Sequence, residues 1–319
     1  MENAHIDNKK RVSLVLGSGG ARGLTHIGVI RWLEENHMEI ASVSGSSVGA
    51  LVGGIYAAGK LDEFEQWVRA ITRTDMVNLM DIAWDRSGLI KGDKIINTLI
   101  GLVGEQHIED LPVSFTAVAC DIKSEREVWL NRGRLFDAIR ASISLPMFFT
   151  PFKWHGRTLI DGGVLNPVPI APTFGDRTDI TIAVNLGGAM SASELEHSGF
   201  QPGSILVPEP ASQALHEKIT RYFRVMGKRS AGKSERDWSA YEVANQAFDA
   251  MQSTIARQKL AAYPPDLVIE VPKNACGTLE FDRADEMIQM GYRKADKALA
   301  SLRVSSPHPV VIPGSHEIY

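Results

Sequence analysis

The chain alternates short apolar runs with longer amphipathic segments, a pattern typical of α/β proteins. The run at 12–16 (VSLVL) predicts a buried strand that ends at a glycine, and the apolar positions after it recur at helical spacing. The pattern then repeats, since 40–44 predicts a second buried strand and 50–58 a small-residue helix that ends at Gly59. Two strand–helix units in succession favour a parallel sheet.

The same criteria predict further elements along the rest of the chain. We expect strands at 114–120, 126–130, 158–160, 180–186 and 267–271, and helices at 62–71, 93–102, 134–144 and 284–302. Between about 190 and 260 the chain is richer in Ser, Glu and Lys, which predicts a mostly helical insertion rather than a second domain. The expected organisation is a polar lead-in at 1–10, a single domain over 11–302 and a tail at 303–319.

Composition and charge narrow the partners and the compartment. The 319 residues are 44% hydrophobic and 23% charged, as in ordinary globular proteins. A net charge of −4 gives no reason to expect a nucleic-acid partner. Cys120 and Cys276 lie in apolar stretches and predict no disulfide framework, which indicates a reducing, cytoplasmic location. The longest weakly polar run, 48–59, is shorter than the roughly 20 residues that a membrane helix needs.

The sharpest local signal is the sequence Gly45-Ser46-Ser47-Val48-Gly49, a G-x-S-x-G pattern between a predicted strand and a predicted helix. A serine on such a turn needs small neighbours, because the backbone doubles back closely. The turn would place the Ser47 hydroxyl at a helix N-terminus, where backbone N–H groups favour negative charge. The alternative is a small-residue turn before a closely packed helix, without any chemistry.

A second glycine-rich turn at 17–23 (GSGGARG) also lies between a predicted strand and a predicted helix. Its exposed N–H groups would bind an anion, either a phosphate or an oxyanion. The dinucleotide-binding pattern G-x-G-x-x-G fails, because no register that opens on this loop places glycine at all three positions and no carboxylate ends the second strand. An oxyanion hole needs only the N–H groups, which makes it the more economical interpretation.

A serine hydroxyl needs an adjacent base, and Asp161 is the best-framed candidate. It ends a predicted strand, and Gly162 and Gly163 after it would let another backbone segment approach closely. A carboxylate accepts a serine proton directly when desolvation raises its basicity. None of the nine histidines follows a strand in a glycine-framed turn, and His155 is the best-placed alternative base. The D-G-G sequence is also a common turn without catalytic meaning.

Four motifs, taken in order along the chain, resemble the patatin-like phospholipase family. They are LGSGGARG at 16–23, GSSVG at 45–49, RASISLP at 140–146 and DGG at 161–163. The resemblance covers about 11–188 and is closest in character to compact bacterial members and to the catalytic domain of neuropathy target esterase. It implies a three-layer α/β/α fold, with a central mostly parallel sheet and a helical insertion.

The resemblance also implies roles for individual residues. Ser47 and Asp161 would form a Ser-Asp dyad without histidine, which hydrolyses a phospholipid or lysophospholipid ester through an acyl-enzyme, with no metal or cofactor. Ser18 stands where many members have glycine, so its side chain narrows the freedom of the loop. The oxyanion hole would comprise Ser18, Gly19, Gly20 and Arg22, and the motif glycines are Gly23, Gly45, Gly49, Gly162 and Gly163.

Two further segments bear on substrate and partners. The apolar run at 145–149 (LPMFF), just before the base, would line an acyl pocket or simply belong to the core. Between 216 and 237, seven Lys/Arg and three acids give a local net charge of +4, which would suit peripheral contact with an anionic membrane, a solvated face or a lid. The alternative to an enzyme is a regulatory or acyl-binding protein, with an unknown protein partner and weak or no hydrolysis.

Overall fold

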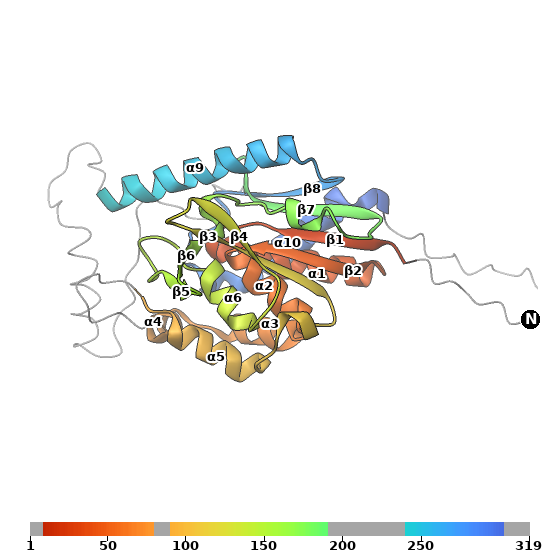
Figure 1. Cartoon of the computed structure of the whole chain (residues 1–319). Coiled ribbons are helices and arrows are strands. Elements are labelled where there is room, and N and C mark those ends of the chain that lie inside the picture. Colours follow the sequence, from red (N-terminus) through yellow and green to blue (C-terminus); the bar gives the residue numbers. More distant parts are fainter. Residues whose placement is uncertain (1–8, 80–89, 191–239, 303–319) are drawn as a thin grey trace, which may run out of the picture.

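The chain folds around one eight-stranded sheet, seen in a computed structural model that describes residues 9–79, 90–190 and 240–302 (Figure 1). The strands are β1 (Arg11–Leu16), β2 (Glu39–Ser46), β3 (Ser114–Asp121), β4 (Arg126–Leu130), β5 (Phe152–Trp154), β6 (Arg157–Asp161), β7 (Ile180–Gly188) and β8 (Leu267–Pro272). The helices are α1 (Thr25–Glu35), α2 (Val48–Ala57), α3 (Leu61–Ala70), α4 (Arg73–Leu79), α5 (Asp93–Val103), α6 (Leu135–Ser142), α9 (Ala240–Ala262) and α10 (Ala284–Ala298). Short 3-10 turns include η1 (Gly20–Leu24) after β1 and η3 (Gly162–Val164) after β6.

The sheet is mostly parallel, as the sequence predicts. Its order is β5-β6-β3-β2-β1-β7-β8, with β4 paired to β3 in addition. The pairs β1–β2, β2–β3, β1–β7 and β7–β8 are parallel, whereas β4 and β6 both run antiparallel to β3. The chain therefore builds a parallel centre and adds an antiparallel edge, to which the short β5–β6 hairpin belongs.

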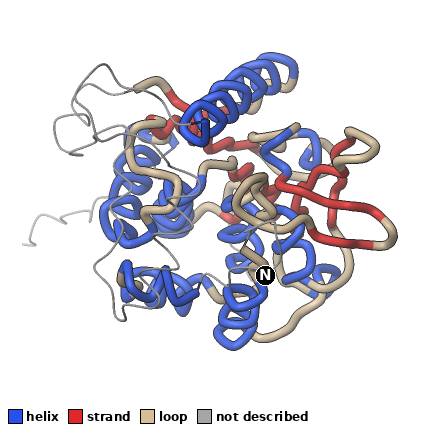
Figure 2. Tube along the Cα trace, turned by 90° about the vertical axis from the view of Figure 1, so that its left-hand side faces the viewer, coloured by secondary structure: helices blue, strands red, loops and turns tan. Residues whose placement is uncertain are grey.

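Helices cover both faces of this sheet, which gives the expected three layers (Figures 1 and 2). The larger core lies on one face, where residues of α1, α2, α3, α5, α6 and α10 pack against the strands. On the other face α9 contributes Ala256 and Leu260, which pack against Val15 of β1 and Ala183 of β7. The loops at the carboxyl ends of β1, β2 and β7 thus lie between the two helical layers.

Helices α1 and α10 cross at very short range. A Cβ atom built at Gly28 would lie 1.9 Å from the carbonyl oxygen of Ile288, and one built at Gly291 would lie 1.9 Å from that of Thr25. Neither position has room for a side chain, so the two helices pack backbone against backbone. This crossing anchors α1, whose N-terminus closely follows the glycine-rich turn at 17–23, called the glycine loop below.

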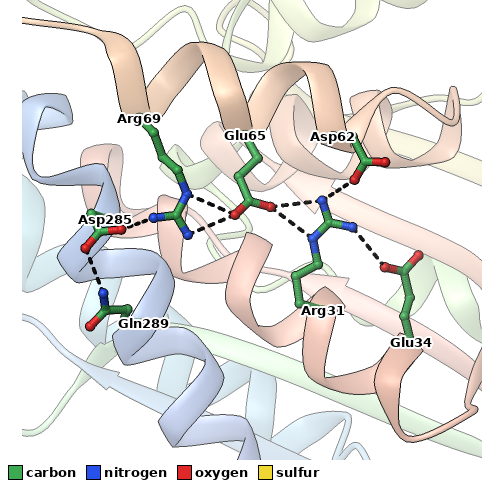
Figure 3. A network of polar contacts seen from close by, with 7 residues as sticks. All are labelled: Arg31, Glu34, Asp62, Glu65, Arg69, Asp285 and Gln289. Atoms are coloured by element: carbon green, nitrogen blue, oxygen red, sulfur yellow. Dashed lines mark hydrogen bonds and ion pairs between the residues drawn. The ribbon is translucent and has the colours of Figure 1, made fainter.

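A polar network on the outside of the larger layer ties α3 to both of these helices (Figure 3). Glu65 of α3 accepts hydrogen bonds from Arg31 of α1 at 2.9 Å and from Arg69 of its own helix at 2.9–3.0 Å. Arg69 in turn contacts Asp285 of α10. The pairs of Glu65 are half-buried and that of Asp285 is more exposed, and ion pairs at the surface contribute about 0–1 kcal/mol each. The network therefore fixes the arrangement of the three helices more than it stabilises the fold.

Most of the predicted elements are present, with boundaries that move by a few residues. The helix expected at 134–144 ends at Ser142, and the one expected at 284–302 ends at Ala298, with a separate 3-10 turn at 300–302. β5 and α4 were not predicted, because each is too short for its periodicity to stand out. Of the expected insertion at 190–260, the structure describes its C-terminal part as α9; the basic segment at 216–237 lies outside the described residues. None of the helices in the described ranges has the length and apolarity to cross a membrane.

The α1–α10 crossing predicts a large difference between two Gly→Ala changes. Gly28→Ala should lower the free energy of unfolding by at least about 1–3 kcal/mol, because the new methyl group overlaps a backbone carbonyl. Gly101→Ala in α5 is the control, since no atom lies within 4 Å of its added Cβ and alanine is the better helix former by about 1 kcal/mol. Denaturant unfolding of both variants measures this, and equal stabilities would contradict the packing.

Candidate active site

Ser47 occupies a strained turn between β2 and α2. Its backbone angles are φ 56° and ψ −124°, which a residue with a side chain rarely adopts and which the surrounding structure has to enforce. Enforcement comes from close backbone contacts at the flanking glycines: a Cβ at Gly45 would lie 2.4 Å from the Gly49 carbonyl oxygen, and one at Gly49 would lie 2.1 Å from that of Leu16. The turn therefore holds the Ser47 side chain between the end of β2 and the N-terminus of α2.

Asp161 reaches this turn because β2 and β6 share one edge of β3. Val118 pairs with Ser46 of β2, and the next residue, Ala119, pairs with Asp161 of β6. β4 occupies the opposite edge of β3 at both of these residues. β2 and the C-terminal end of β6 therefore share the other edge, where β6 continues the pairing after β2 ends. Gly162 allows the fit, because a Cβ there would lie 2.1 Å from the carbonyl oxygen of Val118. Ser47, which follows Ser46, and Asp161 are thus brought together because β2 and β6 pair with consecutive residues of β3.

The environment of Asp161 makes its carboxylate an unusually strong base. The side chain is completely buried, and burial raises the pKa of Asp161 to about 7, against a smaller lowering by the hydroxyl of Ser47 and the amide of Gly163. Its Oδ1 atom accepts a hydrogen bond from the Gly163 amide at 2.7 Å. Its Oδ2 atom is buried and forms no hydrogen bond with any described residue. One oxygen is therefore oriented and the other is available for a proton.

The glycine loop at 17–23 leaves two amides available. Gly19 and Gly20 have no hydrogen-bond acceptor for their N–H groups among the described residues, whereas the flanking amides are bonded. Gly20 has a φ of 58°, which glycine adopts without strain. The bonded amides are those of Gly17 to the Val184 carbonyl (3.0 Å), Ser18 to that of Pro167 (2.9 Å) and Ala21 to that of Thr278 (2.9 Å).

Arg22 orients one of the two available amides. This buried guanidinium donates from Nε to the carbonyl oxygen of Gly19 at 3.1 Å and from Nη1 to that of Lys273 at 2.5 Å. The Gly19 carbonyl and the Gly20 N–H belong to the same planar peptide group and point in opposite directions. Holding the carbonyl therefore fixes the direction of the Gly20 N–H. Gly23 lets the loop pack on α2, since a Cβ there would lie 2.2 Å from the Val48 side chain.

The C-terminal end of α6 and the residues directly after it support both candidate catalytic residues. The amide of Ser47 donates to Oγ of Ser142 at 2.9 Å, and the Ser142 hydroxyl donates to the carbonyl of Val118 at 2.6 Å. Two residues further on, the carbonyl of Ser144 accepts from the amide of Asp161 at 3.0 Å. The sequence interpretation quoted the RASISLP block without singling out these serines. Their signal is two hydroxyl residues among apolar neighbours, two and four positions before Pro146.

The other candidates from the sequence lie elsewhere or at the rim. His155 is exposed in the β5–β6 turn, at the opposite end of β6 from Asp161, so the structure does not bring it to Ser47. In the run 145–149, Met147 is 38% exposed and its neighbours are half-buried. Within the described ranges, no group of three or more His, Cys, Asp or Glu side chains is placed to hold a metal ion.

The fold and this geometry define the class: a three-layer α/β protein with a strained serine between a strand and a helix and a buried carboxylate beside it. A family model described as "Patatin-like phospholipase" matches residues 14–174. The chain belongs to the patatin-like phospholipase family, and it is accordingly a hydrolase of lipid esters.

Similar proteins agree with this membership. An uncharacterized NTE family protein of Mycobacterium tuberculosis is 38% identical over 92% of this chain and 92% of its own length. The lysophospholipase NTE1 of Coccidioides immitis is 25% identical over 94% of this chain, which corresponds to 18% of that larger protein. Among solved structures, VipD from Legionella pneumophila matches 92% of this chain and 67% of its own with a TM-score of 0.43 and 14% identity, a likeness too remote to argue from.

The contacts of Ser142 predict a loss of both stability and activity on Ser142→Ala. Removing Oγ leaves the buried amide of Ser47 without its acceptor, which costs about 1–3 kcal/mol, and loosens the strained turn. Hydrolysis of a soluble ester should therefore fall, measured below the unfolding temperature.

Ser13→Ala is the matched control for this change. Its hydroxyl is equally buried and bonds to Asp176 at 2.9 Å, but it lies near the start of β1, remote from the turn. It should lower stability without lowering the rate per folded molecule. A Ser142→Ala protein whose rate matches that of Ser13→Ala would show that the bond to Ser47 is irrelevant to hydrolysis.

Proposed function

We propose that the chain hydrolyses lysophospholipids or phospholipids by a Ser47–Asp161 dyad, through an acyl-enzyme. The observation that carries the proposal is the buried Asp161 carboxylate, whose pKa is raised to about 7 by burial and whose free Oδ2 lies beside the strained turn of Ser47. A base with a pKa near neutrality suits proton transfer from a hydroxyl at physiological pH. No histidine is needed for this chemistry.

Each step of the proposed cycle is assigned to a group at this site. Asp161 accepts the Ser47 proton while Oγ of Ser47 attacks the ester carbonyl, and the protonated Asp161 then donates that proton to the departing alcohol. Asp161 next accepts a proton from water, which attacks the acyl-serine and releases the fatty acid. Ser47 recovers its proton from Asp161, so the cycle consumes one water and one ester.

The developing oxyanion is stabilised by the amides of Gly19 and Gly20. These are the two N–H groups of the loop that have no acceptor among the described residues, and Arg22 orients the second of them. Removing one such donor from an enzyme costs about 10²–10³ in rate. The sequence predicts that Ser18 also belongs to the oxyanion hole. Because its amide is bonded to the carbonyl of Pro167, we assign it instead a role in supporting the shape of the loop.

Two observations bear on the substrate. The run at 145–149, mostly half-buried and apolar, begins directly after Ser144, whose carbonyl accepts a hydrogen bond from the amide of Asp161. The NTE1 relatives that match nearly the whole chain carry the name lysophospholipase. We infer that the acyl chain lies along this run and that lysophospholipids are the first substrates to test. Peripheral contact with an anionic membrane remains part of the proposal.

The dyad is tested by labelling with a fluorophosphonate, which reacts with activated serines. We expect wild type to be labelled at Ser47, located by mass spectrometry, and Ser47→Ala and Asp161→Asn to lose both labelling and lysophospholipid hydrolysis. Ser46→Ala is the matched control, because the neighbouring hydroxyl is buried without a hydrogen-bond partner in the described structure. A folded wild-type protein that is neither labelled nor active would favour the regulatory or acyl-binding alternative.

The raised pKa of Asp161 also predicts opposite pH trends for rate and stability. Because the base has to be deprotonated, kcat/KM should rise with pH and level off above about 7. The folded pKa lies above the unfolded value of about 3.9, so the folded state binds more protons between the two values. The free energy of unfolding contributed by this group is therefore lost as pH rises from about 4 to about 7.

Asp161→Asn separates these two effects. The variant should be inactive, should lack this part of the pH dependence of stability, and should be more stable than wild type above pH 7, because no charge has to be buried. Denaturant unfolding at a series of pH values measures it. Parallel stability curves for the two proteins would mean that Asp161 does not titrate in this range.

A further inference from the structure

Helix α9 reaches the glycine loop through one side chain. Nε2 of Gln252 donates a hydrogen bond to Oγ of Ser18 at 3.0 Å, across 234 positions of the sequence. α9 comes from the layer opposite the main core, whereas the loop leads into the main core. The bond therefore joins the two helical layers at the edge of the candidate active site.

The same side chain also lies against the turn that carries the base. A Cβ atom built at Gly163 would lie 2.4 Å from Nε2 of Gln252 and 2.4 Å from Oγ of Ser18. The amide of Gly163 is the group that holds Oδ1 of Asp161. The oxyanion loop, the base turn and α9 thus meet at one point, which Gln252 and Ser18 fill together.

Contacts between α9 and the sheet fix the position of the helix close to Gln252. One turn further along α9, Ala256 is buried against the sheet, and Lys259 forms an ion pair with Glu127 of β4 at 2.5 Å. A small pocket of about 20 Å³ lies between this stretch of α9 and Arg22, with Asp249 and Gln252 on the helix side. The helix is thus fixed to the sheet on the C-terminal side of the contact.

The contact also explains why position 18 carries a hydroxyl. The amide of Ser18 is bonded to the carbonyl of Pro167, and its side chain is bonded to Gln252, so the residue before Gly19 is fixed at both ends. Glycine at this position could not accept a bond from α9. The Ser18 hydroxyl and the Gln252 amide therefore form a matched donor–acceptor pair.

We propose that Gln252 is a positioning residue for hydrolysis, which acts through Ser18 to hold the Gly19 and Gly20 amides at the developing oxyanion. The proposal rests on the proposed function, since it concerns the rate of the same reaction. Gln252 acts on the transition state, where the oxyanion forms, so its loss should lower kcat and leave KM nearly unchanged. A displacement of about 1 Å in a catalytic group can cost about a hundredfold in rate.

The test compares glutamines on one helix. Gln252→Ala and the similarly sized Gln252→Met, which cannot donate a hydrogen bond, should lower kcat for lysophospholipid about ten- to a hundredfold with KM within about twofold. Gln258→Ala is the matched control, because Gln258 lies on the exposed side of α9. Should the alanine variant fail to fold, the methionine variant preserves the packing and still removes the donor.

A double-mutant cycle identifies the partner. Ser18→Ala should lower kcat as Gln252→Met does, and the double variant should be no slower than either single variant, because both remove the same bond. Fully multiplied losses would overturn the assigned route through Ser18.

Two other results are equally decisive. Equal kcat values for Gln252→Met and Gln258→Ala would overturn the positioning role, and a raised KM with unchanged kcat would make Gln252 a substrate contact instead. Both results leave the dyad intact, whereas loss of the proposed function appears separately, as a wild-type protein that fluorophosphonate does not label.

Discussion

The arrangement depends on keeping one carboxylate in a place that disfavours its charge. Asp161 is fully buried, and burial has the largest effect on its pKa, which it raises. The groups that lower the pKa are a serine hydroxyl and a single backbone amide. Burying an isolated charge is expensive, so the group stays protonated to a higher pH than usual. What disfavours the charge is also what makes the carboxylate a capable base. The fold must supply the free energy that holds it there.

The fold meets this demand with backbone pairing rather than with counter-charges. β3 carries β2 and β6 on one edge, so Ser46 and Asp161 pair with consecutive residues, and the amide of Asp161 is held by the carbonyl of Ser144. The strained turn of Ser47 is held in the same way, by Ser142. A geometry set by sheet register and buried hydrogen bonds does not change with the ionisation of a surface residue. The polar network of α3 lies outside this region and joins α3 to α1 and α10.

Local patterns in the sequence were sufficient for the parallel centre of the fold and for the three glycine-framed turns. The strand predicted at 126–130 coincides with β4, and the glycines at 45 and 49 predicted close backbone approach before any partner was known. Periodicity could not predict that β6 runs antiparallel on the β2 edge, because pairing direction depends on where the chain returns from. Ser142 and Gln252 were missed for a related reason. Each is an ordinary polar residue in a helix, and its meaning comes from a partner 95 or 234 positions away.

The glycine loop at 17–23, which we propose as the oxyanion hole, is defined by which of its polar groups already form hydrogen bonds. The carbonyls of Gly17 and Gly19 accept from His26, at 2.9 Å, and from Arg22, while the flanking amides are bonded to other segments. Donors that are fixed before the substrate arrives need no reorganisation during the reaction. Burial lowers the pKa of His26 to about 4, so its ring stays neutral and donates from Nε2 throughout the range in which Asp161 titrates. The loop therefore keeps one shape while Asp161 changes its charge. In the proposed mechanism, this separates the pH dependence of proton transfer from that of oxyanion binding.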